Sequence, residues 1–347
     1  MKLSILDKTL QVFFQAASFT PENPMLAQIL RTTCAAIGFC ALATAALAES
    51  YPSKPITILC GQPAGSGPDI MARVFAEAMS QSMGKRVLVS NRAGSGGLIA
   101  AQAAAQAAPD GYTLLLVLSG SHTSLPAMQS VPYDPVKDFE FISMLYASPG
   151  VLMVNAANPA KTFAEFITNA RAKIDGLKFG SPAIGSPAHL MGALFGEATK
   201  LPVINVGYRG GGQILTDLIG GLLDFTFTSS VQALPQIAQG KVRPLAVAGP
   251  ARLKQLPDTP TLQEIGLGQV TIESWFGMAA PKGTPPEIIA RLNGELLKAA
   301  KDPAILRRAE EDSVDLRVGP PAEIMKVLVD EYERLGSAVK RLQIKAE

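Results

Sequence analysis

Short runs of consecutive apolar residues alternate along this chain with longer stretches in which apolar residues recur every three or four positions. The short runs at residues 56–60, 86–91 and 112–118 are dominated by Val, Ile and Leu, as in buried strands. The stretches between them have the period of amphipathic helices. Strands that alternate with helices build a parallel sheet with helices on both faces. The pattern therefore predicts an α/β lobe in the first part of the fold.

The same alternation restarts after residue 150, and this predicts a second lobe. Residues 139–147 and 151–155 are two predicted strands separated only by Ser-Pro-Gly at 148–150. We expect the chain to cross between the lobes at this point. Residues 270–276 are predicted to form the strand that returns to the first lobe.

The predicted fold is therefore a two-lobed α/β protein in which each lobe holds a mostly parallel sheet with flanking helices. Amphipathic helices over residues 287–301 and 321–342 are expected to cover the first lobe, which makes that lobe discontinuous in sequence. Residues 49–147 and 274–347 are assigned to the first lobe, and residues 148–273 to the second.

The loop after the first predicted strand has the composition of an anion-binding helix N-terminus. It reads Ala64, Gly65, Ser66, Gly67 and Pro68 before an apolar-periodic helix begins. Pro suits the first helical position because its missing N–H would have no partner there. The glycines let backbone N–H groups approach a bound atom, and the helix dipole favours an anion. For this loop taken alone, an ordinary corner without a ligand is an equal alternative.

A second corner of similar design follows the predicted strand at residues 177–180. Small residues lead to Ser186, which suits a helix N-cap, and to Pro187 at the first helical position. Ligands of such sheets bind at the carboxyl ends of the strands, so two facing lobes imply a binding cleft. The candidate ligand-binding residues lie in the two corners and at the ends of other strands: Ala64, Gly65, Ser66, Gly67, Asp69, Ser119, Ser181, Ile184, Gly185, Ser186, His189, Tyr208 and Ser229.

Some of these side chains have two interpretations. His189, in the first turn of its helix, either hydrogen-bonds a nearby carbonyl or donates to a ligand carboxylate. Tyr208 and its neighbour Arg209 either contact the cleft or lie on a solvated loop. Asp69 would repel an anion beside it. It therefore either stabilises the first turn of its helix, or orders bridging waters, or receives a ligand hydroxyl or ammonium.

The composition argues against an enzyme and against a nucleic-acid-binding protein. Of the 347 residues only two are His, and neither lies in a metal-ligand motif. No Gly-x-Ser-x-Gly or phosphate-binding Gly-x-x-x-x-Gly-Lys motif occurs. We therefore expect no catalytic residues, no metal and no cofactor. Residues 49–347 hold 28 basic and 27 acidic side chains without a basic stripe, so we expect no nucleic acid partner.

Residues 25–48 have the layout of a secretory signal peptide. A basic residue, Arg31, precedes a short apolar run, and Ala46-Leu47-Ala48 forms an Ala-x-Ala cleavage site. The run is shorter than the ~20 residues of a membrane-spanning helix. We therefore expect an exported product, and we interpret residues 1–24 as a misassigned start. Export would leave Cys60 as the only cysteine, and its apolar strand indicates a small buried side chain.

An ordered series of motifs lies at residues 51–56, 91–97, 109–115, 132–139, 274–277 and 280–285. Through these motifs the chain resembles, over residues 51–347, the Bug (TctC-type) extracytoplasmic solute receptors. The chain departs from the family's pattern at Gln62, at Thr228 and in the first loop, where the family usually has Pro-Gly-Gly.

This resemblance implies a Venus-flytrap periplasmic binding protein that captures a small carboxylate for the membrane subunits of a tripartite tricarboxylate transporter. It also implies that residues 64–69 and 181–189 hold the ligand carboxylates. We expect the receptor to be a monomer. One alternative is a ligand sensor that docks on a membrane kinase. The other is a secreted α/β hydrolase with Ser66 or Ser186 as nucleophile, which the missing acid–base partner disfavours.

The signal-peptide interpretation predicts that the exported protein begins at Glu49. Cleavage after Ala48 is expected because small residues occupy both recognition positions of the site. N-terminal sequencing of the periplasmic fraction checks this. Recovery of periplasmic protein that retains residues 1–48 would contradict it.

Overall fold

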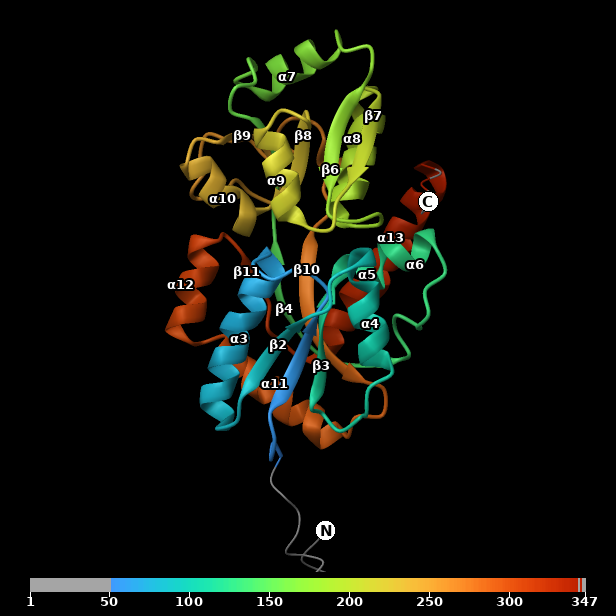
Figure 1. The fold of residues 1–347 in the computed structure, drawn as a ribbon, viewed down its shortest axis with the longest axis vertical. Coiled ribbons are helices and arrows are strands. Elements are labelled where there is room, and N and C mark those ends of the chain that lie inside the picture. The colour runs from blue at the N-terminus through green and yellow to red at the C-terminus, as the bar shows by residue number, and fades with distance from the viewer. Residues whose placement is uncertain (1–50, 343, 345–347) are drawn as a thin grey trace, which may run out of the picture. The chain divides into compact units, whose positions relative to one another are not determined.

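Two sheets, each flanked by helices, organise the fold (Figure 1). The structure, a computed structural model, describes residues 51–342 and residue 344. The expected signal peptide, its cleavage site and residues 1–24 lie outside the described residues. By its internal contacts Lys54–Glu347 forms one unit, and every element named below belongs to it.

The first sheet contains six strands in the order β11-β4-β10-β3-β1-β2. Its central members pair over stretches of Val, Ile, Leu, Phe and Met that are buried on both faces, which is why they read as continuous apolar runs. The strands are β1 (Ile56–Cys60), β2 (Val87–Asn91), β3 (Thr113–Leu118), β4 (Phe139–Ser148), β10 (Ser274–Pro281) and β11 (Asp315–Leu316).

The second sheet contains five strands in the order β7-β6-β8-β5-β9. Its core is a separate apolar cluster in which aromatic rings from β6, β8 and the helix after β6 meet, with Phe179 and Phe225 stacked at 5.4 Å. The strands are β5 (Gly150–Asn155), β6 (Leu177–Ser181), β7 (Val203–Gly207), β8 (Phe225–Ser229) and β9 (Val242–Ala248).

Strand pairing confirms the two-lobed α/β fold with mostly parallel sheets, each of which also holds antiparallel members. In the first sheet β1 pairs in parallel with β2 and β3, whereas β10 runs antiparallel to β3 and β4. In the second sheet β6 pairs in parallel with β7 and β8, whereas β5 runs antiparallel to β8 and β9. The antiparallel strands β5 and β10 are the first strands that the chain forms after it crosses from one lobe to the other.

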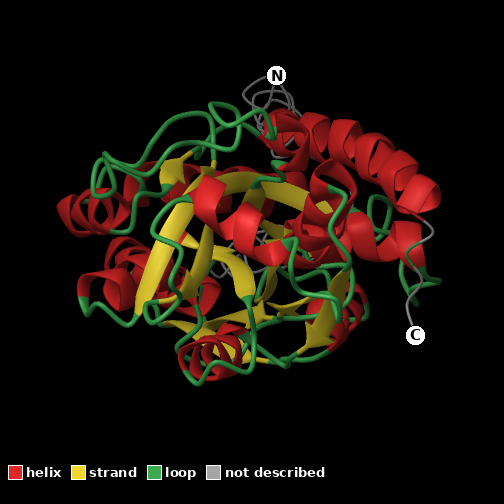
Figure 2. Cartoon of the chain, turned by 90° about the horizontal axis from the view of Figure 1, so that it is seen from above, coloured by secondary structure: helices red, strands yellow, loops and turns green. Residues whose placement is uncertain are grey.

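Helices cover both faces of the strands, as Figure 2 shows from above. The helices of the first lobe are α3 (Gly67–Met83), α4 (Leu98–Ala105), α5 (Ser119–His122), α6 (Ser124–Met128), α11 (Pro286–Ala299) and α12 (Pro303–Glu311). Those of the second are α7 (Phe163–Ala170), α8 (Pro187–Thr199), α9 (Gly211–Ile219) and α10 (Ser230–Ala238). Short 3₁₀ turns are formed by Ser95–Gly97 and Gly268–Val270. The segment from Ser119 to His122, directly after β3, is the one-turn helix α5.

The C-terminal helix α13 (Pro321–Leu342) joins the two lobes. Ile324 and Leu328 are buried in the core of the first sheet, whereas Leu335 and Val339 are buried in the core of the second. Figure 1 shows α13 running from the side of the first sheet to the side of α8. The prediction that this helix covers the first lobe is therefore only half correct. Its apolar stripe is continuous, and a hydrophobic period does not reveal that two cores share it.

Glu331 lies on α13 between these two sets of contacts and is almost fully buried. Its carboxylate accepts a hydrogen bond from the Trp275 indole N–H on β10, and Arg334 lies 3.7 Å away. Burial raises the pKa of Glu331 to about 7, although the bond from Trp275 and the charge of Arg334 act in the opposite direction. The folded state therefore holds this proton more tightly than the unfolded chain does.

We predict that Glu331 makes the stability of the protein fall as the pH rises from about 4.5 to about 7. The contribution of a group with a raised folded-state pKa is complete below its unfolded pKa and is lost as the pH rises through its folded pKa. The free energy of unfolding of Glu331→Gln minus that of wild type should be roughly 2 kcal/mol larger at about pH 8 than at about pH 5.5. Urea unfolding at the two pH values measures this.

Glu333→Gln, an exposed position on the same helix, is the matched control and should show no such gain. A Glu331→Gln variant whose stability followed pH in parallel with wild type would show that this carboxyl does not titrate in the window.

Candidate functional site

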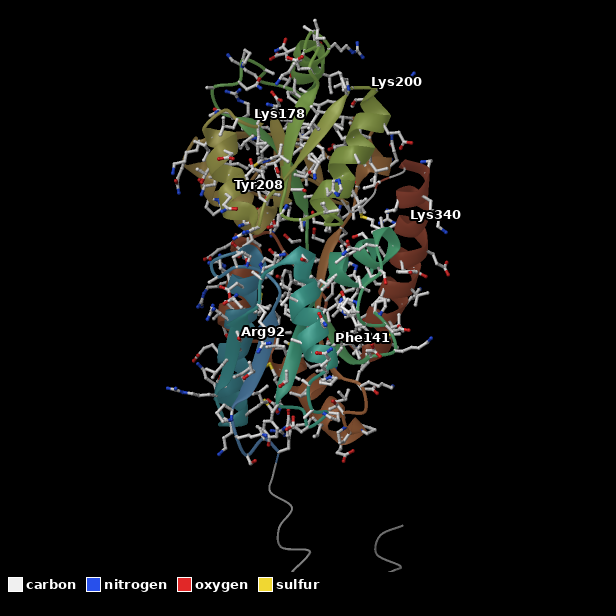
Figure 3. The ribbon with its side chains drawn as sticks, turned by 45° about the vertical axis from the view of Figure 1, so that its right-hand side comes forward. Arg92, Phe141, Lys178, Lys200, Tyr208 and Lys340 are labelled. Atoms are coloured by element: carbon white, nitrogen blue, oxygen red, sulfur yellow. The ribbon has the colours of Figure 1, made fainter. Side chains whose placement is uncertain are left out.

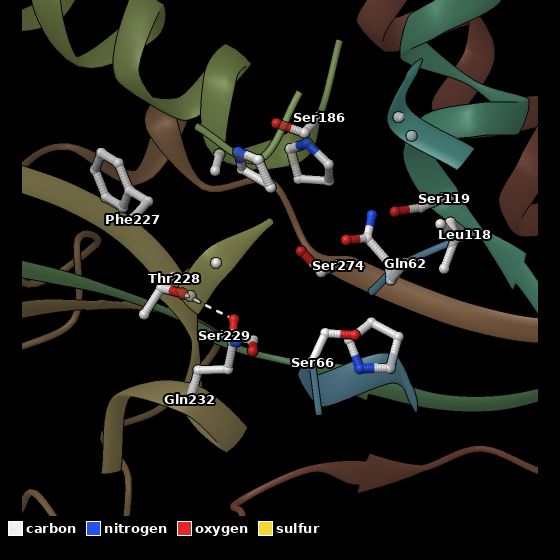
Figure 4. A pocket seen from close by; sticks show the side chains of 18 of the residues that line it. Gln62, Ser66, Leu118, Ser119, Ser186, Phe227, Thr228, Ser229, Gln232 and Ser274 are labelled. Carbon is white, nitrogen blue, oxygen red and sulfur yellow. Dashed lines mark hydrogen bonds between the residues drawn. The ribbon is translucent and has the colours of Figure 1, made fainter. Parts of the chain in front are cut away.

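A cavity of about 110 Å³ lies between the two lobes, at the carboxyl ends of β1, β3, β6 and β8. Figure 4 shows side chains from both lobes around it. The first lobe contributes Gln62, Ser66, Pro68, Gly96, Leu118, Ser119, Gly120, Ser274 and Phe276. The second contributes Gly150, Pro182, Ser186, Pro187, Ala188, Met191, Gly211, Ile214, Phe227, Thr228, Ser229 and Gln232.

Ser66 brings an unused hydroxyl to this cavity. It is the N-cap residue of α3, with an extended backbone, yet its side chain caps no N–H of its own helix. The residue is 7% exposed, and its Oγ has no hydrogen-bond partner in the described part of the chain. A buried hydroxyl without a partner is unfavourable unless a ligand or water bonds it. The 17-residue helix behind it adds the positive end of its dipole.

Asp69 fixes the loop that carries Ser66. One of its carboxylate oxygens accepts from the Gly65 N–H at 2.8 Å and from Arg73 Nε at 3.0 Å. The other accepts from Asn91 Nδ2 at 2.8 Å and lies 2.9 Å from an Arg73 Nη. Burial alone would raise the pKa of Asp69, but the bonds from Arg73, Asn91 and Gly65 outweigh it and hold that pKa below its ordinary value. The carboxylate is thus fully engaged with the protein.

The loop before α8 has the same backbone arrangement, but a histidine ring takes the place of the carboxylate. Gly185 has a positive φ of 77°, as Gly65 has one of 79°, and its N–H donates to Nδ1 of His189 at 3.1 Å. In each loop the glycine N–H is bonded by the side chain four residues later. Ser186, unlike Ser66, uses its hydroxyl within the protein, since it accepts from the His189 N–H at 3.3 Å and donates to Ala183 at 2.8 Å.

His189 is neutral and serves the second loop. Burial lowers its pKa to about 4, so the ring carries no positive charge at neutral pH. Its Nδ1 accepts from Gly185, and its ring stacks on Phe179 at 6.4 Å. His189 does not line the cavity. The bond differs from the predicted one to a carbonyl, because the ring accepts from a backbone N–H.

The thirteen candidate residues fall into three groups. Four line the cavity itself: Ser66, Ser119, Ser186 and Ser229. Four line one of two flanking openings of the cleft, and these are Ala64, Gly65, Ile184 and Tyr208. The remaining five line neither the cavity nor these two openings: Gly67, Asp69, Ser181, Gly185 and His189.

Tyr208 and Arg209 lie on the loop between β7 and α9, beside the cleft. The Tyr208 hydroxyl donates to Asp217 at 2.6 Å; desolvation and this bond raise the pKa of Tyr208 to about 12. Figure 3 shows Tyr208 at the edge of the second lobe that faces the first. Arg209 is exposed and lines both flanking openings, and no acidic side chain of the described residues pairs with it. Among the described residues it is the only cation that lines the cavity or these openings.

Several cavity-lining residues are absent from the sequence-based candidates. They form an apolar wall of Leu118, Met191, Ile214, Phe227 and Phe276, interrupted by the polar groups of Gln62, Thr228, Gln232 and Ser274. The sequence gives a partial signal for two of these lining residues, because Leu118 and Thr228 immediately precede the candidates Ser119 and Ser229 at strand ends. Ser274 and Phe276 share one face of β10, as residues two apart in a strand do, while Trp275 on the other face bonds α13.

The two lobes contact each other on opposite sides of the cavity. On one side the Ser124 hydroxyl donates to the Gly185 carbonyl. On the other side Gly210 lies against Pro63 so closely that a Cβ on Gly210 would be 2.8 Å from Pro63 Cγ. These contacts hold residues of the two lobes directly against each other beside the cavity.

Two features that would bear on function are absent from the described residues. No described helix combines the length and the apolarity needed to cross a bilayer. No set of three or more His, Cys, Asp or Glu side chains is grouped there so as to hold a metal ion.

Comparisons with known proteins agree with this geometry. Residues 71–344 match the model of the tripartite tricarboxylate transporter family receptors, TctC. Protein BugT of Bordetella pertussis is 33% identical over 295 residues, which cover 84% of this chain and 90% of BugT. The periplasmic binding protein BugD has the same fold, with a TM-score of 0.81 at 28% identity over 86% of this chain and all of BugD. Rpa4515 of R. palustris, solved with adipate, gives a TM-score of 0.81 at 29% identity over 85% of this chain and 99% of Rpa4515.

These matches confirm the resemblance drawn from the sequence motifs and the two-lobed architecture. The family model alone spans more than half of the chain, and it continues through both lobes and all of α13. The chain belongs to the TctC, or Bug, family of tripartite tricarboxylate transporter receptors.

Proposed function

We propose that this chain is an exported periplasmic receptor that captures a small carboxylate between its lobes and delivers it to the membrane subunits of a tripartite transporter. The observation that carries the proposal is the buried hydroxyl of Ser66 at the N-terminus of α3, which lines the cavity between the lobes and has no hydrogen-bond partner among the described residues. The expected cleavage after Ala48 and the periplasmic relatives support the export step.

The proposed ligand is an anion because the cavity offers hydrogen-bond donors and helix N-termini. Residues at the N-termini of α3, α8, α9 and α10 line its wall, namely Ser66, Ser186, Gly211 and Ser229. Helix N-termini carry partial positive charge and free N–H groups, which together bind carboxylates without an arginine. The adipate in the related structure of Rpa4515 is a carboxylate of suitable chemistry.

The contacts of the candidate nucleophiles do not support the hydrolase alternative. Ser66 has no base beside it, and Ser186 bonds the backbone N–H of His189, not its ring. The thiol of Cys60 is buried, and burial raises its pKa to about 11. A nucleophile needs an adjacent base or a lowered pKa. The family assignment favours a transport receptor over a sensor that docks on a kinase.

Ser66→Ala should weaken carboxylate binding without weakening the fold. The variant removes a donor to the anion, and a hydrogen bond to a charged group contributes about 1.5–3 kcal/mol, or roughly tenfold to a hundredfold in dissociation constant. Titration calorimetry of the purified mature protein, with adipate and a panel of other small carboxylates, measures the affinity.

Ser186→Ala is the matched control, since it removes the N-cap of α8. It should lower the free energy of unfolding by about 1 kcal/mol, whereas Ser66→Ala should leave that quantity within about 0.5 kcal/mol of wild type. Unchanged affinity in Ser66→Ala would count against the proposed carboxylate site. Failure of every carboxylate to bind wild type would reject the proposed function.

Gly210→Ala should weaken ligand binding by hindering closure of the lobes. Its φ is 176°, which any residue adopts, but its added Cβ would lie 2.8 Å from the ring of Pro63 in the other lobe. Such overpacking costs about 1–3 kcal/mol, which corresponds to roughly fivefold to a hundredfold in affinity. Gly212→Ala is the control, because no atom lies within 4 Å of its added Cβ. Equal affinities for the two variants would contradict the proposed closure.

A further inference from the structure

In the described part of the chain, helix α13 is a third connection between the lobes, besides the two crossings of the chain between the sheets. Ile324 and Leu328 in its first half are buried in the core of the first lobe. Glu331, further along the helix, accepts a hydrogen bond from Trp275 of β10. The first half of α13 is therefore fixed to the first lobe.

The second half of α13 is fixed to the other lobe. Val339 is buried in the core of the second lobe together with Leu335. Arg341 pairs with Glu197 on α8, with two N–O distances of 3.2 Å. When the lobes move relative to each other, α13 therefore has to bend between Glu331 and Val339, or one of its halves has to lose these contacts.

Gly336 and Ser337 lie in this middle segment of α13. Gly is less stable than Ala inside a helix, and Gly/Ser pairs are among the few places where helices bend sharply. The Ser337 hydroxyl donates to the Glu333 carbonyl at 3.1 Å, and such a bond to the preceding turn often bends a helix. Packing does not require the glycine, because among the described residues a Cβ on Gly336 would meet nothing closer than Ala127 Cβ at 3.9 Å.

The middle of α13 lies on the side of the cavity where α6 and α8 bring the lobes together. Ser124 at the start of α6 donates to Gly185, just before α8. Gly336 lies beside Ala127 of α6, and Arg341 binds α8. Figure 1 shows α13 beside α6 and reaching toward α8. In the structure α13 is one continuous helix while the lobes touch, and separation of α6 from α8 displaces its two halves relative to each other.

We propose that Gly336 and Ser337 form a bending point in α13, so that the helix follows the lobes as they open and its stiffness sets how easily they open. The continuous helix belongs to the state in which the lobes touch. A residue that stiffens this point therefore favours closed lobes, and a residue that loosens it favours open lobes. The inference rests on the lobe movement of the proposed function and adds the element that controls it.

Gly336→Ala stiffens α13 at this point and should shift the ligand-free protein toward closed lobes. The difference between Gly and Ala in a helix corresponds to about a fivefold change in the ratio of open to closed protein. The same variant should release a bound carboxylate about fivefold more slowly, because release follows opening. Ser337→Gly, at an exposed position, should change both quantities in the opposite direction.

Gly294→Ala is the matched control. Gly294 lies inside α11, which packs on β4 and α3 of the first lobe, and no described atom lies within 4 Å of its added Cβ. Both Gly-to-Ala variants should raise the resistance to urea by similar amounts, because both replace a helical glycine. Only Gly336→Ala should change the opening of the lobes.

Spin labels at Gln106→Cys and Asn169→Cys measure the separation of the lobes without ligand. Both positions are exposed, one at the end of α4 in the first lobe and one on α7 in the second, and the thiol of Cys60 is buried. Electron–electron double resonance gives the ratio of open to closed protein. Stopped-flow fluorescence of Trp275, the single tryptophan of the chain, measures the release of adipate, or of whichever small carboxylate calorimetry finds to bind.

Equal release rates and equal ratios for Gly336→Ala and Gly294→Ala would overturn the bending point and leave the proposed function standing. A change in the same direction in Gly336→Ala and Ser337→Gly would do the same. A labelled wild type with one separation, unchanged by a saturating carboxylate, would overturn the lobe movement and this inference, while the calorimetric binding would still support a receptor. If no carboxylate binds, the proposed function falls, and the spin-label ratios alone decide the bending point.

Discussion

The hydrogen bond from the Gly65 N–H to the Asp69 carboxylate fixes the loop on which the binding site depends. Gly65 adopts a positive φ, and the carboxylate that bonds it is itself held by Arg73 from the same helix and Asn91 from the adjacent strand β2. Bonds to an ionised acceptor are stronger than neutral ones, so the loop is firmly positioned. With its backbone set in this way, Ser66 begins α3 with its hydroxyl unused.

The second lobe uses the same geometry for a different purpose. Gly185, Ser186 and His189 stand where Gly65, Ser66 and Asp69 stand in the first, but the neutral ring of His189 replaces the carboxylate. Ser186 caps α8, so its hydroxyl adds less to the binding of a ligand. The two sides of the cleft are therefore unequal. The first lobe presents a free donor, while the second contributes helix dipoles and most of the apolar wall.

Much of this arrangement follows from local sequence, and the rest depends on packing. The strand runs, the two corners rich in Gly, Ser and Pro with Ser66 and Ser186, and the position of Ser119 and Ser229 at strand ends are predictable, because each is set by a few neighbouring residues. The direction of β10 is not predictable, since hydrophobic periodicity is the same in parallel and antiparallel strands. Nor is the bonding of Asp69, because Asn91 is 22 residues away. Local sequence also does not predict that Phe227 and Ser274 line the cavity, because the packing of the two sheets decides which face of their strands points into it.

A structure of the protein with bound adipate tests the central claim most directly. We expect one carboxylate of the ligand at the N-terminus of α3, with an oxygen about 2.5–3.0 Å from Ser66 Oγ, and the methylene chain against Phe227 and Phe276. Asp69 should keep its bonds to Gly65, Arg73 and Asn91. A ligand whose carboxylates are both bound by Arg209 or His189, with the Ser66 hydroxyl still unpaired, would contradict the account.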